Sequence, residues 1–286
     1  MICAVTEATT WGGRARSRVK PRRGARARRS RAGLVAGAVL ALTLFAAPAL
    51  ACRWEPSSET IAGYAGEGEI TLASGAKALV TDVSVGDHAA AAAIVARAAR
   101  TAHAIAFLSG AGEDRWRRRP ARILLDPDSA APRDLAATLV ATGAARVDPG
   151  AREGLCDKAL LAREDIARRA GRGLWREETA RAVPADRPDL VLERAGRFAI
   201  VEGVVVGVGE RARRTYIDFS RNWDGGFTVI VAPRVWATLV ERGLDADTLT
   251  GRRVRVRGII QYWRGPAVEL ATADFVETMD AERRRR

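Results

Sequence analysis

Apolar residues after residue 51 recur mostly in short runs that alternate with polar residues or end at glycine, a pattern typical of β-strands. A loop rich in Pro, Ser and Glu is predicted directly after Cys52. The order inferred for the first half is then three strands, a helix, two strands and two helices. Its clearest segments are strands at 68–74, 77–85, 102–110 and 121–127, and helices at 87–101, 132–143 and 152–172.

The second half has three predicted strands, one helix and two further strands. This order favours a small closed barrel of the oligonucleotide-binding (OB) type, and the alternation fits a packed interior. Residues 179–192, with two prolines and mixed charge, are predicted to be a linker. The strands are expected at 199–208, 214–220, 226–232, 252–263 and 266–276, and the helix at 233–243.

The positive charge is concentrated at the two ends of the chain. The formal net charge is +13, but residues 1–51 hold ten Lys/Arg and one acid, and 283–286 are all arginine. The remaining body is nearly neutral, which excludes a protein that coats DNA through overall charge. Any contact with nucleic acid must therefore come from local patches.

The first 51 residues have the organisation of a targeting segment. A basic stretch precedes an apolar run at 33–47, and Ala49 and Ala51 form the small-residue pattern that a signal peptidase accepts, with cleavage before Cys52. We therefore expect export to the periplasm or beyond the cell. The alternatives are an inner-membrane anchor at 33–51 and a lipoprotein whose first mature residue is Cys52.

Cleavage would leave two cysteines, Cys52 and Cys156, in the mature chain. In an exported protein, two cysteines can form a disulfide that persists in the oxidising compartment. The pair is therefore a disulfide candidate.

The helical segments at 133–147 and 162–175 resemble the C-terminal helices of thermonuclease (staphylococcal nuclease-like) domains, which commonly end in Arg-Gly-Leu-Trp, as residues 172–175 do here. The whole chain resembles exported proteobacterial members with an appended OB-like domain. This resemblance implies an α+β fold, mainly β, with two OB-like five-stranded barrels, the first with nuclease-type helices. The implied domains are 1–51 (basic region with signal peptide or anchor), 52–178 (thermonuclease-like), 179–192 (linker), 193–280 (OB-like barrel) and 281–286 (basic tail).

The resemblance implies calcium-dependent phosphodiester hydrolysis, but most of the catalytic positions differ. Gly66 and Gly68 stand where the family has two aspartates, Leu79 replaces an arginine, and Ser84 falls at a second calcium-binding aspartate. The segment 114–118, Asp-Arg-Trp-Arg-Arg, matches the third family motif, so Arg118 occupies a phosphate-binding position.

Acids near the vacated positions are the alternative calcium ligands: Glu67, Glu69, Asp82 and Asp87. A shift of one residue in a strand turns a side chain to the opposite face, which favours solvated turn acids over ligands. We expect no metal site and no cofactor, and Ca²⁺ only if the nuclease site functions.

Basic and aromatic residues form two groups of nucleic-acid-binding candidates. Arginines beside aromatic rings can hold single strands by stacking and charge. The opposing interpretation places the aromatics inside a barrel and the arginines on a solvated edge strand. The candidates beside Arg118 are Arg115, Trp116 and Arg117, and those of the C-terminal domain are Arg214, Tyr216, Arg253, Arg255 and Arg257, the last three predicted to form one basic face.

These observations predict an exported thermonuclease-like protein with a degenerate active site. It would bind single-stranded nucleic acid or another polyanion. Two alternatives stay open: an active calcium-dependent nuclease that uses displaced carboxylates, and a protein-interaction module of the cell envelope. Membrane contact is expected only through an uncleaved signal or anchor.

Overall fold

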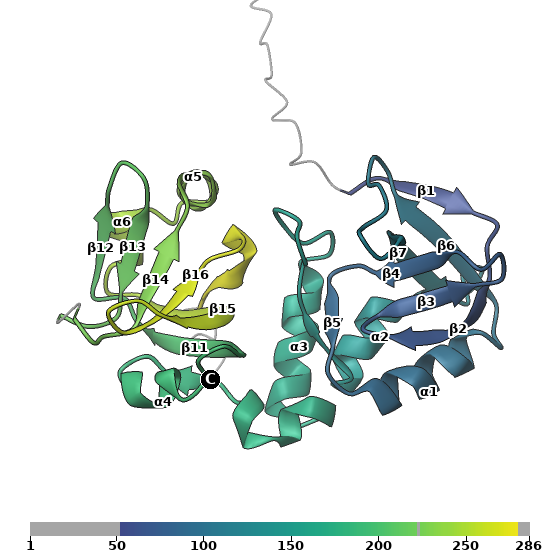
Figure 1. The fold of residues 1–286 in the computed structure, drawn as a ribbon, viewed down its shortest axis with the longest axis horizontal. Coiled ribbons are helices and arrows are strands. Elements are labelled where there is room, and N and C mark those ends of the chain that lie inside the picture. The colour runs from purple at the N-terminus through teal and green to yellow at the C-terminus, as the bar shows by residue number, and fades with distance from the viewer. Residues whose placement is uncertain (1–51, 222–223, 280–286) are drawn as a thin grey trace, which may run out of the picture. The chain divides into compact units, whose positions relative to one another are not determined.

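The computed structural model describes residues 52–221 and 224–279, and within them strands outnumber helices (Figure 1). This confirms the expected α+β class with mainly β structure. The targeting segment predicted at 1–51 and the basic tail predicted at 281–286 lie outside the described residues. In the part that is described, no helix has the length and apolar character needed to cross a bilayer.

The N-terminal half, residues 52–178, is built on one main sheet and a separate two-stranded pair. Its elements are β1 (Trp54–Ser57), β2 (Ile61–Gly66), β3 (Glu69–Leu72), β4 (Lys77–Val80), β5 (Val83–Val85), α1 (His88–Ala98), β6 (His103–Leu108), β7 (Arg118–Leu125), β8 (Arg133–Asp134), α2 (Leu135–Thr142), β9 (Ala145–Val147), α3 (Ala159–Arg169) and the 3₁₀ turn η1 (Gly173–Arg176). The main strand order is β1-β6-β7-β4-β3-β2, with β8 on the end of β7, and β5 pairs with β9. Only the β4–β7 pairing along this order is parallel.

Capping residues explain where α1 begins and where α2 begins and ends. The Asp87 carboxylate accepts a hydrogen bond from the N–H of Ala90, so α1 begins where the sequence predicts. Asp134 caps α2, which therefore begins at Leu135, three residues after the predicted start at residue 132. Gly143, at a φ of +75°, ends α2. The next helix, α3, covers only 159–169 of the predicted 152–172.

Two strands occupy the segment that was predicted to be a loop. Both β1 and β2 lie at the ends of the strand order, where Pro56 can be accommodated on an edge. Polar and small residues in these strands hide the apolar alternation. The strand predicted at 77–85 is divided into β4 and β5, because Asp82 between them adopts a left-handed φ of +63°.

The C-terminal half contains a second sheet with a similar connectivity. Its elements are β11 (Phe198–Val204), β12 (Gly207–Glu210), β13 (Thr215–Asp218), β14 (Thr228–Val231), α5 (Pro233–Glu241), α6 (Ala246–Leu249), β15 (Arg253–Tyr262), β16 (Pro266–Glu269), the 3₁₀ turn η3 (Ala273–Phe275) and β17 (Val276–Thr278). The strand order from β11 is β11-β15-β16-β14-β13-β12, and β17 pairs with β15. The strand predicted at 199–208 is divided into β11 and β12.

The segment 179–192, predicted to be a linker, belongs largely to the C-terminal core. It contains the end of a 3₁₀ turn, η2 (Glu178–Ala180), the strand β10 (Val183–Pro184) and the helix α4 (Pro188–Leu192). Strand β10 pairs in parallel with β11. Buried Val183, Ala185 and Val191 pack into the apolar cluster of this half. The apolar residues on either side of the two prolines are the signal that the linker prediction overlooked.

The two halves share one pairing pattern. In each, one interior pairing of the main order is parallel: β4 with β7, and β14 with β16. In the first order β1 and β2 lie at opposite ends, and in the second β12 lies at one end while β11 lies next to the short end strand β10.

Candidate nucleic-acid interface

The C-terminal half presents a stacked aromatic pair. Tyr216 on β13 and Trp263, in the turn between β15 and β16, have ring centroids 5.4 Å apart and planes within 16° of parallel. Tyr262 beside them is 71% exposed, and Trp263 is 43% exposed. Adjoining exposed aromatic side chains mark a candidate binding surface, and here two exposed rings follow each other in the chain while the partly buried Tyr216 stacks on the second. We call Tyr216, Tyr262 and Trp263 the aromatic surface.

A tight turn holds Trp263 in place. Its N–H donates to the carbonyl of Gly265 at 2.8 Å, and Arg264 adopts a left-handed φ of +57°. The N–H of Gly225 donates to the carbonyl of Arg264 at 2.9 Å. A side chain at Gly265 would come within 2.7 Å of the Gly226 carbonyl oxygen, so close packing of two loops requires glycine there.

Arginines flank the residues of the aromatic surface along the chain. The turn between β12 and β13 carries three exposed arginines: Arg211, Arg213 and Arg214. The Arg214 guanidinium lies 3.2 Å from the Glu269 carboxylate, with both side chains about half exposed. Arg264 lies 5.7 Å from the centre of the Trp263 ring. Of the predicted candidates, Tyr216 therefore contacts Trp263, and Arg214 lies two residues before Tyr216 in the chain.

The N-terminal half has a second basic and aromatic group, organised by Asp114. One Asp114 oxygen accepts the N–H groups of Trp116 and Arg118, at 2.9 and 3.0 Å, and the other accepts Nε of Arg118 at 2.9 Å. The guanidinium groups of Arg115 and Arg118 lie over the exposed Trp116 ring, 3.8 and 4.5 Å from its centre. Arg117, at a φ of +64°, turns the chain between them.

Hydrogen bonding dominates the charge state of Asp114. Burial would raise the pKa of its carboxyl group, but the side-chain and backbone hydrogen bonds from Arg118, with that from Trp116, outweigh it and lower the pKa. Arg118 therefore faces an ionised carboxylate at neutral pH. An anionic ligand must compete with Asp114 for this arginine.

Arg118 and Trp116 line a depression of about 640 Å³. The positions that the resemblance compares with a nuclease site, Gly66, Leu79 and Ser84, line the same depression. Residues from β2, β4, β5 and the start of β7 thus meet at one place.

The carboxylates of this depression do not form a calcium site. Glu69 lies 2.9 Å from the Lys77 ammonium group, Asp148 lies 3.7 Å from Arg146, and Glu67 lies 3.4 Å from Nε2 of His88. Calcium prefers six to eight oxygen ligands. Within the described ranges, no three His, Cys, Asp or Glu side chains are grouped to hold a metal ion. The donor set therefore does not fit Ca²⁺.

The two remaining candidate acids, Asp87 and Asp82, have structural roles. Asp87 caps α1. Asp82 is only 4% exposed and forms an ion pair with Arg152. Burial raises the pKa of Asp82, and Arg152 only partly counteracts this.

The predicted basic face on β15 is wrong for two of its three arginines. Arg255 and Arg257 are 6% and 1% exposed, whereas the Arg253 side chain is 52% exposed. Alternation along the strand correctly places the three on one face, but that face is covered. The buried pair contact four carboxylates from three elements: Glu164 and Asp165 of α3, Glu202 of β11 and Glu277 of β17.

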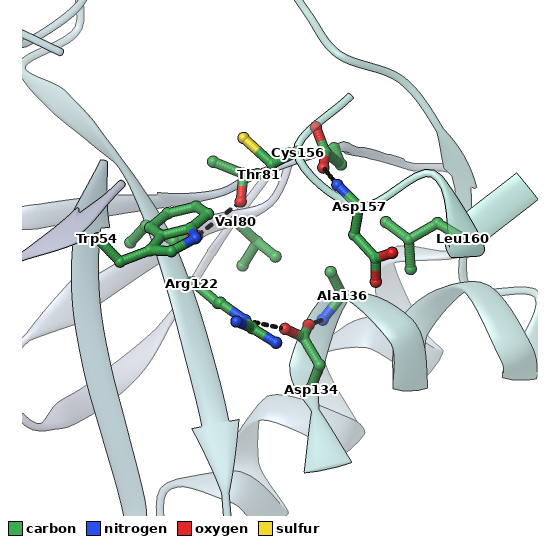
Figure 2. Close-up of a pocket in the computed structure, with 11 residues that line it drawn as sticks. Trp54, Val80, Thr81, Arg122, Asp134, Ala136, Cys156, Asp157 and Leu160 are labelled. Atoms are coloured by element: carbon green, nitrogen blue, oxygen red, sulfur yellow. Dashed lines mark hydrogen bonds and ion pairs between the residues drawn. The ribbon is translucent and has the colours of Figure 1, made fainter. Parts of the chain in front are cut away.

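A smaller pocket of about 280 Å³ was not anticipated from the sequence (Figure 2). Trp54, Thr81, Arg122 and Asp134 are among its lining residues. Nε of Arg122 donates to one oxygen of Asp134 at 2.8 Å, and the other oxygen accepts the N–H of Ala136 at 2.8 Å. Arg122 and Asp134 thus form an ion pair within the lining, which also includes Asp82 and Asp157.

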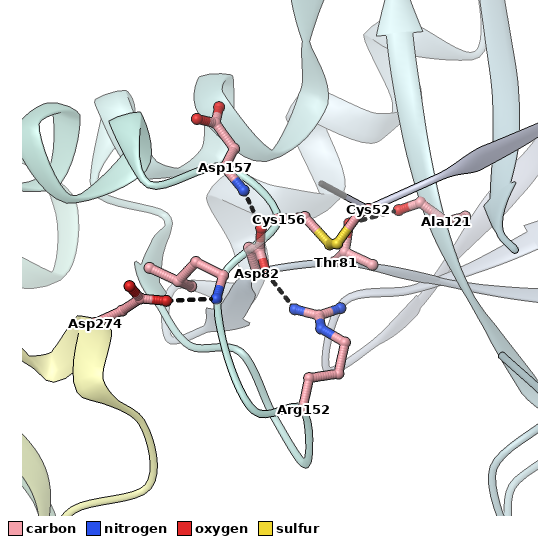
Figure 3. Close-up of a disulfide and its surroundings, with 9 residues drawn as sticks. Cys52, Thr81, Asp82, Ala121, Arg152, Cys156, Asp157 and Asp274 are labelled. Atoms are coloured by element: carbon pink, nitrogen blue, oxygen red, sulfur yellow. Dashed lines mark hydrogen bonds and ion pairs between the residues drawn. A yellow bond between two sulfur atoms is a disulfide. The ribbon is translucent and has the colours of Figure 1, made fainter. Parts of the chain in front are cut away.

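The predicted disulfide between Cys52 and Cys156 is confirmed beside this pocket (Figure 3). The cysteines are 104 residues apart, and their Cα atoms lie 5.3 Å apart. Asp82 positions the loop that carries Cys156, because its carboxylate accepts the N–H of Asp157 at 2.8 Å and binds Arg152. The bond thus ties the first described residue to the loop before α3.

The function must be inferred from these residues and their geometry. No model of a known protein family matches this chain, and no curated protein matches it.

Proposed function

We propose that this protein binds single-stranded nucleic acid through the aromatic surface of its C-terminal half. The stacked pair Tyr216 and Trp263 is the observation that carries the proposal. Bases stack on exposed aromatic rings whatever their sequence, and neighbouring arginines attract the phosphates. The three arginines of the β12–β13 turn supply that charge.

The pairing pattern supports an OB-like barrel as the scaffold of this surface. OB folds bind oligonucleotides on the face of strands 2 and 3, flanked by the loops between strands 1 and 2 and between strands 4 and 5. Taking β11 and β12 as one interrupted strand, these features correspond to β13, β14, the β12–β13 turn and the β15–β16 turn. Tyr216, Arg214 and Trp263 come from three of these four places.

The N-terminal half is proposed to be a thermonuclease-like OB barrel that holds phosphate without cleaving it. Support comes from the depression that brings Gly66, Leu79, Ser84 and Arg118 together. Because its carboxylates do not suit Ca²⁺, no hydrolytic step is proposed. Arg118 beside Trp116 would provide an additional contact for a nucleic-acid strand.

Export is proposed together with this function. The Cys52–Cys156 disulfide supports it, since such bonds persist mainly in oxidising compartments. The ligand would then be nucleic acid outside the cytoplasm, or another flexible polyanion.

The test is fluorescence anisotropy with a labelled oligothymidine of about 15 nucleotides, near the upper site size of one OB fold. Binding should weaken steeply as salt increases, because phosphate contacts release counterions. Trp263→Ala should reduce affinity about tenfold or more, whereas Tyr216→Phe, which keeps the ring, should change it little.

Two controls separate the alternatives. Trp116→Ala removes the other tryptophan that is exposed among the described residues, and it should have the smaller effect. The same oligonucleotide, incubated with calcium or with chelator, reports on cleavage. Chelator-sensitive cleavage would favour a working nuclease, and an absence of salt-dependent binding would reject the proposal in favour of a protein-interaction role.

A further inference from the structure

A third cavity, of about 230 Å³, is lined by three arginines and by no acidic residue. Arg146 comes from β9, and Arg194 and Arg197 come from the turn between α4 and β11. The rest of the lining is mainly apolar and includes Leu174, Trp175, Phe198 and Ile200. In contrast, carboxylates balance the arginines in the two cavities described above.

Three hydrogen-bond donors of this lining are buried without an acceptor. They are Nε of Arg146, Nε1 of Trp175 and Nε of Arg194. Trp175 is only 4% exposed. Because nearly all buried donors in proteins are satisfied, three orphans in one small cavity indicate a missing acceptor.

The positive charge of the cavity is only partly compensated. The single ion pair of Arg146 in the described chain is with Asp148, at 3.7 Å. Burial lowers the pKa of Arg146, and Asp148 and Glu164 offset this only in part. No carboxylate among the described residues lies within ion-pair distance of Arg194 or Arg197.

The backbone holds these donors in fixed positions. Gly143 and Gly173 contact each other directly, and the N–H of Leu174 donates to the Gly143 carbonyl at 2.9 Å, which places Trp175. The turn at 194–197 is anchored to β15, since the N–H of Gly196 donates to the Ile260 carbonyl at 2.8 Å. The Arg146 guanidinium lies 4.5 Å from the centre of the Phe198 ring.

We propose that this cavity binds a small organic oxyanion, a carboxylate or phosphate group on a compact apolar body. The oxyanion supplies acceptors for the three unpartnered donors and the counter-charge for the arginines. Leu174, Phe198 and Ile200 contact the apolar part. The volume lies below the usual range of ligand pockets, which limits the ligand to about the size of a single ring.

This site is separate from the proposed nucleic-acid surface, so each proposal is tested by its own probe. The cavity probes are phenyl phosphate, benzoate and inorganic phosphate, with benzyl alcohol as the neutral analogue. They are titrated into the full-length chain with its disulfide formed. Calorimetry gives affinity, and the Trp175 indole N–H signal, assigned with Trp175→Phe, reports on the site directly.

We expect phenyl phosphate or benzoate to bind with a dissociation constant of about 1 mM or tighter, inorganic phosphate more weakly, and benzyl alcohol not measurably. Binding should shift the Trp175 indole signal. The stronger of the two aromatic anions identifies the charged group. Arg194→Gln and Arg197→Gln should each weaken binding about tenfold or more. The matched control Arg187→Gln removes an exposed arginine that is paired with Asp189, and it should bind as the parent does.

The proposal is overturned if neither aromatic anion binds, or if binding leaves the Trp175 signal unmoved. It is also overturned if Arg194→Gln and Arg197→Gln, folded by circular dichroism, both retain the affinity of the parent. Oligonucleotide binding by the same variants is measured in parallel. It should be unchanged, since the aromatic surface shares no residue with the cavity.

Discussion

Arg257 of β15 and Glu164 of α3 form an ion pair in which both side chains are almost completely buried, at 1% and 0% exposure. The second Glu164 oxygen accepts the N–H of Val147 at 2.7 Å, and the second Arg257 nitrogen binds Glu277. The two halves of the chain are thus joined through a charged pair with further polar partners. A buried pair of this kind is costly to break from one side, since the remaining charge stays buried.

Arg257→Met should therefore destabilise the protein by about 3–5 kcal/mol, because Glu164 is left without its cation. Urea unfolding followed by tryptophan fluorescence measures this. Arg253→Met on the same strand is the matched control, with an expected effect within about 0.5 kcal/mol, since that side chain is half exposed. If Arg257→Met and Arg253→Met lost similar amounts of stability, the buried ion pair between Arg257 and Glu164 would be contradicted.

Reduction of the disulfide should lower stability by about 2–5 kcal/mol, because the bond closes a loop of about a hundred residues. Cys52→Ala/Cys156→Ala should have the stability of the reduced parent and should not respond to reductant. Mass spectrometry should show a gain of two hydrogens on reduction of the parent. An unchanged mass would show that the thiols are unpaired.

The lowered pKa of Asp274 predicts that the stability of the protein depends on pH. Burial would raise the pKa of its carboxyl group, but the N–H of Leu155 and the cations Lys158 and Arg242 outweigh burial and lower the pKa below the ordinary 3.8. A lowered folded-state pKa adds stability above the unfolded value, and this is lost as the pH falls through the folded value.

Asp274→Asn should accordingly be less stable than the parent at pH 7, and the difference should shrink as the pH drops below about 4. Urea unfolding at several pH values measures this, with exposed Asp128→Asn as the control for charge. If the stability difference between the parent and Asp274→Asn grew towards acid pH, the lowered pKa of Asp274 would be contradicted.

The alternation of apolar and polar residues predicts most strands because it depends only on neighbouring positions. It fails at β1 and β2, where Pro56, small residues and charged residues obscure the pattern. The capping role of Asp87 was predictable for the same local reason, and so was the helix end at Gly143. The disulfide was predicted from the cysteine count and the expected compartment.

The environment of charged residues could not be predicted in this way. Whether Arg255 and Arg257 face solvent depends on Glu164, Asp165, Glu202 and Glu277, which lie up to 93 residues away. The cavity of Arg146, Trp175 and Arg194 likewise requires contacts between distant segments. Tyr216 and Arg214 were identifiable as candidates, but the stacking partner Trp263 was only one of several aromatics in that half.

Removing the competitor of Arg118 should strengthen anion binding at the depression. Asp114→Asn keeps an oxygen that can accept the backbone N–H groups of Trp116 and Arg118 but removes the charge that holds the guanidinium. Oligonucleotide affinity should rise by up to about fivefold, the equivalent of a surface ion pair. Glu113→Gln, which removes a neighbouring charge paired with Arg117, is the matched control and should change affinity less. A loss of affinity in Asp114→Asn would show that Arg118 does not contact the strand.

The contact between Gly143 and Gly173 gives the sharpest test of the packing behind Trp175. Gly143 has a φ of +75°, and a Cβ there would come within 2.1 Å of the Arg172 carbonyl oxygen. Gly143→Ala should therefore destabilise by more than about 3 kcal/mol, combining backbone strain with displacement of the Arg-Gly-Leu-Trp turn. Gly110→Ala isolates the strain, because its φ of +73° is nearly the same and open space surrounds it, so about 1–2 kcal/mol is expected. Urea unfolding measures both losses. If Gly143→Ala and Gly110→Ala lowered the free energy of unfolding equally, the backbones of Gly143 and Gly173 would not be in contact.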